Sequence, residues 1–466
     1  MINEEEKSGT GTIVFPVILE LILEAVLLLK NTSAAISYLY CLIPLLLLTV
    51  FIGTYLYNRN GDMKLFQAVM NLSAIGCALQ VYIDEVYITD SSFSLIKLLV
   101  SVVIAVVFVL FYRLIRKLLN ANFTSYVMMA VSFLVYAALL IKGYDPNGYG
   151  TSAWIRIGSL TLQLTDFTKI SAVLFYASLF SSKRERTDKE ILIHSTVFFG
   201  INLVGSLLIR ELGSFLILLF LHLSILYIFM RRSTFKRNYL LAVFISIFGA
   251  VAIAFLLYKL ILPSHEAGSM NALESLLWPI VNKVHQRFSV TANIESDPYG
   301  AGYQLYQGRK ALWMAGLFGN TVHFTAIPVA ESDMAYVAMV NSFGWIMGIF
   351  VISCFARIVI SGCRLSRKLV RFELQDAIVV FGATFLIFLQ AMIVILGSCN
   401  IIPFTGLPIP FLSRGGTYQT IVFCFTALLL MESEYDGNNV ISDDYEKEKE
   451  VSELEDTEET QEIREL

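Results

Sequence analysis

The stretch that decides the fold reads Ile402-Pro403-Phe404-Thr405-Gly406-Leu407-Pro408-Ile409-Pro410-Phe411-Leu412-Ser413-Arg414-Gly415-Gly416. Its three prolines and three glycines rule out a regular helix and predict a re-entrant or tightly turned path. Apolar runs flank it at 376–398 and 417–431, and both read as membrane helices. Irregular backbone at membrane depth is tolerated only where it packs in protein or lines a wet cavity. The sequence therefore predicts a turned segment beside a cavity in a membrane protein.

The composition of the whole chain points the same way. Of its 466 residues 56% are apolar and 15% charged, whereas soluble domains have about 45–50% apolar and about 25% charged residues. The apolar runs are near-continuous and lack a period of two, so they predict helices rather than barrel strands. We therefore expect an all-α polytopic membrane protein. About twelve spans are predicted, at 13–29, 37–56, 65–83, 95–113, 125–141, 167–181, 191–208, 214–230, 239–262, 334–356, 376–398 and 417–431.

The distribution of Lys and Arg predicts the orientation of these spans. With the N-terminus in the cytoplasm, five loops on that side carry about twice as many basic residues as the outer segments, as the positive-inside rule requires. We therefore expect a multi-pass protein of the plasma membrane with both termini in the cytoplasm. The three long segments 142–166, 263–333 and 399–416 are then extracytoplasmic, and connections of this length are usually functional or disordered. Binding or chemistry is expected at the outer face.

Three parts of the chain follow from this topology. N-terminal membrane helices occupy 1–141, a core with the three outer segments occupies 142–431, and an acidic tail occupies 432–466. The tail combines many acidic residues with few large apolar ones, so we expect a disordered or solvated cytoplasmic segment. The six cysteines and five histidines show no metal-ligand spacing, so a catalytic metal held by His and Cys is not expected.

Four blocks carry a resemblance to a known family. The segment GLPIPFLSRGG at 406–416 closely resembles the C-terminal signature of the SEDS proteins (shape, elongation, division and sporulation), the RodA/FtsW/SpoVE group. In the same order along the chain, 154–169 resembles the family's RW…FQPSEFAK block, 210–214 stands where the family has PDLGT, and 297–304 resembles DPxGxGYQ. The resemblance covers about 150 to 430. Two spans more than usual precede the Trp154 block, which implies an extra N-terminal hairpin.

The resemblance implies an activity and a partner. Family members polymerise lipid II, the undecaprenyl-diphosphate-linked disaccharide-pentapeptide, into glycan strands, and they pair with a class B penicillin-binding protein, a single-span transpeptidase. A peptidoglycan glycosyltransferase for cell shape, division or sporulation is therefore expected, with no nucleic acid as partner. No cofactor is assigned with certainty, and assistance by Mg²⁺ or Mn²⁺ is left open.

The resemblance also assigns the catalytic acid. The family's PExHTDFIF segment aligns with 328–336, which makes Asp333 its essential aspartate. A diphosphate-linked donor already carries a good leaving group, so the reaction needs a base near the acceptor hydroxyl and cations on the diphosphate. Asp333 would be the base in an inverting transfer. The alternative, that Asp333 only caps the next helix, is compatible with this role.

Six further residues are expected to bind substrate. Lys169 matches the family lysine, and Arg287 is a second candidate for the diphosphate charge. A lysine at this place could instead snorkel. Glu211 replaces the family's aspartate, and it either orients the cavity or pairs with Arg210. Trp154, Gln304 and Ser413 come from the family's blocks.

The chain also departs from the family pattern. Val329 stands where the family has Glu, Leu164 where it has Pro, and Ala153 where an Arg precedes the Trp. Two other functions stay open: a flippase for the lipid-linked precursor, which would place functional polar groups near the bilayer midplane or on both sides, and a non-catalytic scaffold for the transpeptidase, in which Asp333 would be dispensable.

Overall fold

The computed structural model describes residues 11–86, 95–119, 123–145, 150–158, 160–181, 186–231, 234–295, 297–320, 327–414 and 416–434. The predicted acidic tail lies outside these residues from 435 onward. The same is true of 146–149, 159, 296, 321–326 and 415 in the predicted outer segments.

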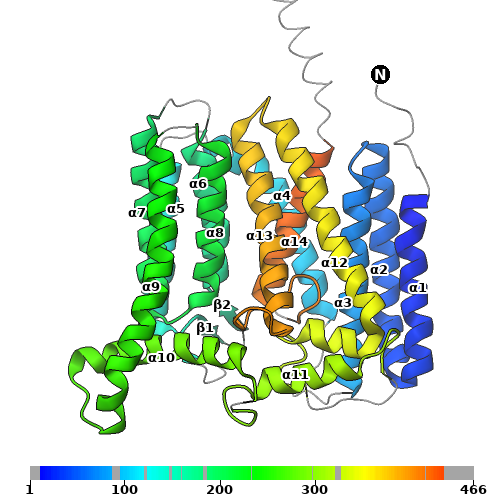
Figure 1. Ribbon diagram of the computed structural model, residues 1–466. Coiled ribbons are helices and arrows are strands. Elements are labelled where there is room, and N and C mark those ends of the chain that lie inside the picture. The colour runs from blue at the N-terminus through cyan, green and yellow to red at the C-terminus, as the bar shows by residue number, and fades with distance from the viewer. Residues whose placement is uncertain are drawn as a thin grey trace, which may run out of the picture.

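In the part of the chain that the structure describes, twelve long helices form the body of the bundle, and each corresponds to one predicted span (Figure 1). Their bounds are α1 (Gly11–Lys30), α2 (Thr32–Asn58), α3 (Met63–Val86), α4 (Leu95–Leu119), α5 (Thr124–Lys142), α6 (Thr165–Leu179), α7 (Asp188–Leu208), α8 (Leu212–Phe229), α9 (Thr234–Glu266), α12 (Ala335–Leu369), α13 (Leu374–Ser398) and α14 (Gly416–Ser433). Among the described residues nine of them are long and apolar enough to cross a membrane, and α4, α6 and α14 fall short of that measure. The predicted all-α polytopic fold is confirmed.

Local sequence signals explain where several helices begin. Thr187 and Glu190 form a capping box at the start of α7, and the Asn31 side chain accepts a hydrogen bond from the backbone N–H of Ala34 at the start of α2. Such caps satisfy N–H groups that have no partner within the helix. Large apolar side chains remain exposed along the outside of the bundle, for example Leu29 at 89% and Phe51 at 73%, as expected for helices that face lipid.

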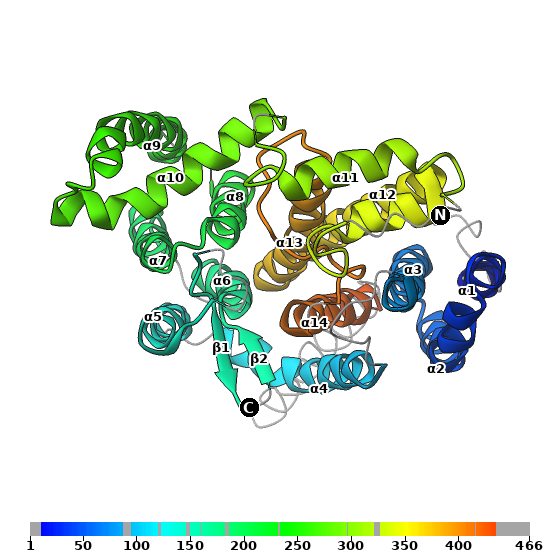
Figure 2. The ribbon, with the colours of Figure 1, turned by 90° about the horizontal axis from the view of Figure 1, so that it is seen from below.

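The centre of the bundle is built on α3, α12 and α13. Most side chains of α3 and α13 are buried, and α12 packs against both helices. The hairpin of α1 and α2 packs against α3 at the edge of the bundle (Figure 2). In contrast, α9 lies on the outside, with most of its side chains exposed or half-buried.

The short and irregular elements gather at one end of the bundle (Figure 1). They are the antiparallel strands β1 (Trp154–Ile157) and β2 (Leu160–Gln163), the helices α10 (Ala272–Ala292) and α11 (Tyr303–Met314), and the turned stretch 402–416, here called the signature loop. The described chain begins and ends at the opposite end. The three long connecting segments of the sequence analysis therefore meet at one face.

A break inside α12 was not predicted. Gly344 has φ 92° and ψ 171°, which is not helical, and a Cβ at this position would lie 2.1 Å from the carbonyl oxygen of Leu317. The backbone N–H groups of Trp345 and Ile346 donate to the carbonyls of Gly316 and Leu317, at 3.1 and 3.2 Å. The segment after α11 therefore accepts the two backbone hydrogen bonds that the break leaves without partners inside the helix. The short first part of α12, from Ala335 to Phe343, stays at the end of the bundle where the irregular elements lie.

Candidate functional site

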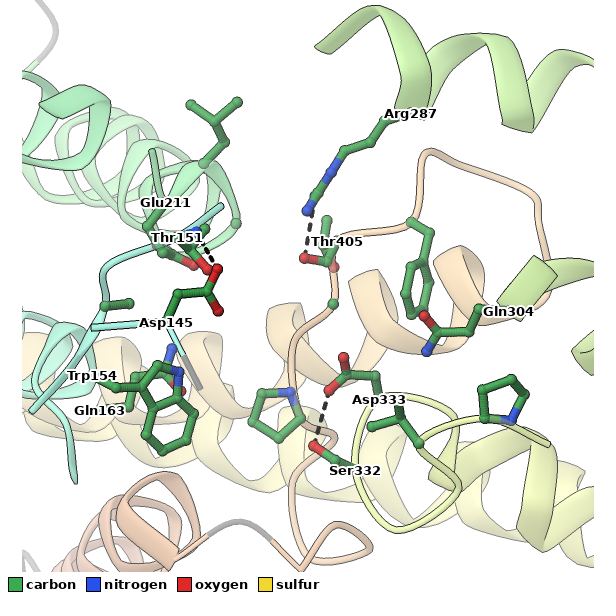
Figure 3. Close-up of a pocket in the computed structure, with 18 of the residues that line it drawn as sticks. Asp145, Thr151, Trp154, Gln163, Glu211, Arg287, Gln304, Ser332, Asp333 and Thr405 are labelled. Atoms are coloured by element: carbon green, nitrogen blue, oxygen red, sulfur yellow. Dashed lines mark hydrogen bonds between the residues drawn. The ribbon is translucent and has the colours of Figure 1, made fainter. Parts of the chain in front are cut away.

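A cavity of about 770 Å³ opens among the irregular elements. Its walls come from β1 and β2, α10, α11, the start of α8, the turn before α12 and the signature loop (Figure 3). The charged side chains along it include the carboxylates of Asp333 and Glu211 and the cations of Lys283 and Arg287. The cavity thus combines acidic and basic groups from segments far apart in sequence.

Asp333 lies in the turn directly before α12 and is 9% exposed. Its Oδ1 accepts a hydrogen bond from the hydroxyl of Ser332 at 2.9 Å. Its Oδ2 faces Gly406 of the signature loop, where a Cβ would lie only 3.4 Å from that oxygen. Gly406 has φ +67°, a conformation that glycine adopts at little cost. The loop can therefore pass close to the carboxylate without covering it.

The environment of Asp333 favours its protonated form more than water does. Burial raises the pKa of this carboxyl from 3.8 to about 6, and the neighbouring Glu331 charge adds to the rise. The Ser332 hydrogen bond and the Arg287 charge oppose it, and both lower the pKa. A carboxylate with a pKa near 6 is still ionised at neutral pH and can accept a proton there, as a general base must.

Two cations on α10 face the same cavity one helical turn apart. Arg287 donates from Nη1 to the carbonyl oxygen of Thr405 at 3.2 Å, and Figure 3 shows it reaching toward the signature loop. Lys283 donates from Nζ to the carbonyl oxygen of Arg210 at 3.1 Å. Burial, reinforced by the Arg287 charge, lowers the pKa of Lys283 to about 8. Sequence reasoning missed Lys283, although its i, i+4 spacing to Arg287 in a helical segment was a usable signal.

Three more of the predicted residues line the cavity. Glu211 caps α8, because both of its oxygens accept from the backbone N–H of Ser214 at 3.1 and 3.2 Å, and burial raises its pKa. Trp154 lies on β1, paired with Gln163 of β2. Gln304 is the second residue of α11, and its amide Nε2 has no hydrogen-bond partner among the described residues. That buried amide lies beside Asp333 (Figure 3).

Lys169 and Ser413 do not line the cavity, although both were expected to bind substrate. The Lys169 ammonium is 1% exposed and donates to Asp166 Oδ1 at 2.8 Å and to Gln390 Oε1 at 2.9 Å. The Ser413 hydroxyl donates to the carbonyl of Ser332 at 2.9 Å and accepts from the N–H of Ile409 at 2.7 Å. Both side chains are occupied by internal bonds. In this geometry they support the walls of the cavity.

The cavity offers polar contacts without a dedicated metal cage. Among the described residues no group of three or more His, Cys, Asp and Glu side chains is placed to hold a metal ion.

Asp145, which sequence reasoning missed, accepts a hydrogen bond from the backbone N–H of Thr151 at 3.1 Å and so orders the turn at one edge of the cavity. Its place in a loop with no motif gave no signal in advance.

The sequence model of the FtsW/RodA/SpoVE family of cell cycle proteins matches residues 59–437 of this chain. This chain belongs to that family. Stage V sporulation protein E of Bacillus subtilis is 24% identical over 322 residues, which are 67% of this chain and 79% of the relative. A probable peptidoglycan glycosyltransferase FtsW of Lactococcus lactis is 26% identical over 398 residues, which are 79% of this chain and 86% of the relative.

Solved structures of the FtsW/RodA/SpoVE fold agree with the helical arrangement. The rod shape determining protein RodA of Thermus thermophilus matches with a TM-score of 0.53 at 16% identity, covering 81% of this chain and 98% of RodA. A chain of a peptidoglycan synthase complex, solved to show how polymerization and crosslinking are coordinated, matches with a TM-score of 0.58 at 18% identity, covering 80% and 97%. The family match begins at residue 59, directly after α2.

Proposed function

We propose that this member of the FtsW/RodA/SpoVE family is an inverting peptidoglycan glycosyltransferase that polymerises lipid II into glycan strands. One observation supports this most directly: a buried carboxylate with a raised pKa, Asp333, shares a single cavity with two cations on α10. The names of the relatives support the same reaction class.

In the proposed reaction, each of these side chains has a separate role. The cations of Lys283 and Arg287 bind the diphosphate of the donor and stabilise the charge that grows as it leaves. Asp333 takes the proton from the 4-hydroxyl of the acceptor sugar while that oxygen attacks the anomeric carbon of the donor from the opposite face. One C–O bond forms, the bond from the anomeric carbon to the diphosphate oxygen breaks, and the configuration inverts. The free amide of Gln304 donates to a sugar oxygen or amide carbonyl. In this scheme Lys283 and Arg287 of α10 bind the diphosphate, the role that was expected for Lys169.

A divalent cation, if one takes part, would be held by carboxylates of the cavity such as Glu211 and Asp333, and it would neutralise charge on the leaving diphosphate. Polymerisation assayed with and without Mg²⁺, Mn²⁺ and a chelator decides whether either ion takes part.

Both ends of the chain are proposed to be cytoplasmic and the cavity extracytoplasmic. The described chain begins and ends away from the cavity, at the end of the bundle to which the basic loops also belong. A cysteine at the exposed position Gln286 should react with an impermeant maleimide from outside intact cells, and a cysteine at Arg231, at the opposite end, should not. Reaction at Gln286 only after the cytoplasm is opened would overturn the orientation and the proposed reaction.

The proposed partner is a single-span class B penicillin-binding protein, in keeping with the match to one chain of a peptidoglycan synthase complex that coordinates polymerization and crosslinking. Crosslinking in cells followed by purification should recover one. Recovery of a fully active protein with no penicillin-binding partner after crosslinking would count against this assignment.

The decisive experiment uses purified protein, lipid II and separation of the glycan products on gels. Asp333→Asn keeps size and hydrogen bonding but cannot accept a proton, so strand formation should fall by about 10²–10⁴-fold. Glu295→Gln is the control, because Glu295 is exposed and paired only with Arg309 among the described residues. Wild-type polymerisation by Asp333→Asn would favour the scaffold. Lipid II translocation into vesicles by a wild-type protein that forms no strands would favour the flippase.

A further inference from the structure

A stripe of residues on α3 contacts both the signature loop and the turn that carries Asp333. Gly76, Gln80 and Asp84 are spaced by four residues and so lie on one face of the helix. The sequence predicts 65–83 only as a membrane span. None of the three residues belongs to the blocks that carry the family resemblance.

Gln80 is the centre of this stripe and is 2% exposed. Its amide Nε2 donates to the carbonyl oxygen of Leu412 at 2.6 Å and to that of Glu331 at 3.1 Å. Its Oε1 accepts from Arg414 Nε at 3.2 Å. One side chain therefore bonds to the signature loop twice and to the turn that carries Asp333 once.

The neighbours of Gln80 on the stripe fix the same loop. A Cβ at Gly76 would lie 2.1 Å from the carbonyl oxygen of Phe411, so the loop rests directly on the backbone of α3. Asp84 forms an ion pair with Arg414. The loop and the Asp333 turn are also joined to each other, because the N–H of Arg414 donates to the carbonyl of Glu331 at 2.8 Å.

We propose that Gln80 is a positioning residue, which holds the Asp333 turn and the signature loop in the register that presents the carboxylate to the acceptor hydroxyl. This inference rests on the proposed function. Gln80 does not line the cavity, so it acts on the reaction only through the two segments that it joins. A misplacement of about 1 Å at a reacting group can lower a rate by about 10²-fold.

The test compares two variants with a matched control. Gln80→Met removes both donors at similar volume, and Gln80→Glu keeps an acceptor for Arg414 while it removes the NH₂ group. The control is Ser73→Ala, since Ser73 is a buried polar residue of the same helix, and among the described residues its hydroxyl bonds only to the carbonyl of Val69. If Gln80→Met does not fold, Gln80→Glu carries the test.

Both Gln80 variants should lower the turnover number about 10- to 100-fold while KM for lipid II changes less than about 3-fold. In Gln80→Met the acid limb of the rate profile should also move to lower pH, because a loosened turn admits water and relieves the burial that raises the pKa of Asp333. A general loss of folded protein would lower the amount of active enzyme without moving that limb. Ser73→Ala should match the wild type in all three quantities.

The outcomes separate this inference from the proposed function. Wild-type turnover and pH profile in both Gln80 variants, with Asp333→Asn inactive, would overturn the inference and leave the function intact. If the wild-type protein forms no strands, the function fails, and hydrogen exchange decides the inference. In that case faster exchange of the amides at 329–334 and 409–414 in Gln80→Met than in Ser73→Ala supports the positioning role, and equal exchange overturns it.

Discussion

Replacing Asp333 by Asn should make the folded protein more stable. The pKa of this carboxyl is raised from 3.8 to about 6, so the folded state binds the proton more tightly than the unfolded chain does. The cost of ionising Asp333 is therefore absent below pH 3.8, grows between pH 3.8 and 6, and is complete above pH 6. At about 1.36 kcal/mol per pKa unit, the rise from 3.8 to about 6 corresponds to about 3 kcal/mol at neutral pH.

The assay is unfolding of the detergent-solubilised protein at pH 4 and pH 8, with wild type, Asp333→Asn and the exposed control Glu295→Gln compared. Asn is neutral and still accepts the hydrogen bond from the Ser332 hydroxyl. The variant should match the wild type at pH 4 and exceed it by about 1–3 kcal/mol at pH 8, the lower values allowing for water in the cavity. The Glu295→Gln control should follow the wild type at both pH values.

An Asn variant that is less stable than the wild type at both pH values would refute the reasoning. The carboxylate would then hold the turn before α12 in place, and its ionised form would be a structural requirement. A gain in stability together with a loss of polymerisation would instead identify a group kept charged at a cost to the fold, as functional sites often are.

Three other predictions follow from the site and the fold. Arg287→Gln should move the acid limb of the rate–pH profile for polymerisation to higher pH, because the Arg287 charge lowers the pKa of Asp333. An unchanged acid limb would show that the two groups do not interact. The Lys283 ammonium, with a pKa of about 8, should lose its charge as pH rises through that value, so KM for lipid II should increase above pH 8 in the wild type and stay flat in Lys283→Arg. Gly344→Ala should destabilise the protein by at least about 1–3 kcal/mol from backbone strain alone, as measured by unfolding, whereas Gly249→Ala, at a site where a Cβ meets nothing within 4 Å, should be neutral or slightly stabilising.

The long helices could be predicted because burial in lipid leaves a strong and local signal in the sequence. Each predicted span overlaps one helix, and the turned path of 402–416 followed from its prolines and glycines. The break in α12 could not be predicted, since the residues around Gly344 are apolar enough to continue a helix. What stabilises the break is the pair of backbone bonds to Gly316 and Leu317, which only the folded chain brings together.

Residues of the candidate site could be predicted where a sequence motif contains them. They could not be predicted where tertiary contacts decide whether a side chain lines the cavity. Asp333, Arg287 and Gln304 do share a cavity. Lys169 was expected there too, but Asp166 and Gln390 occupy its ammonium, and Gln390 lies 221 residues further along the chain. Gln80 gave no signal, because a glutamine inside an apolar span looks the same whether it faces a neighbouring helix or holds a loop.

The stripe on α3 also sets an order for biosynthesis. The two carbonyls that Gln80 bonds lie 251 and 332 residues later in the chain. At about 5–20 residues per second, α3 would wait roughly 15–70 seconds for the last of them to be made. Unsatisfied polar groups are costly in lipid, and α3 is also the least apolar of the nine candidate spanning helices. A nascent chain that ends before the signature loop therefore leaves the Gln80 amide without its partner at Leu412.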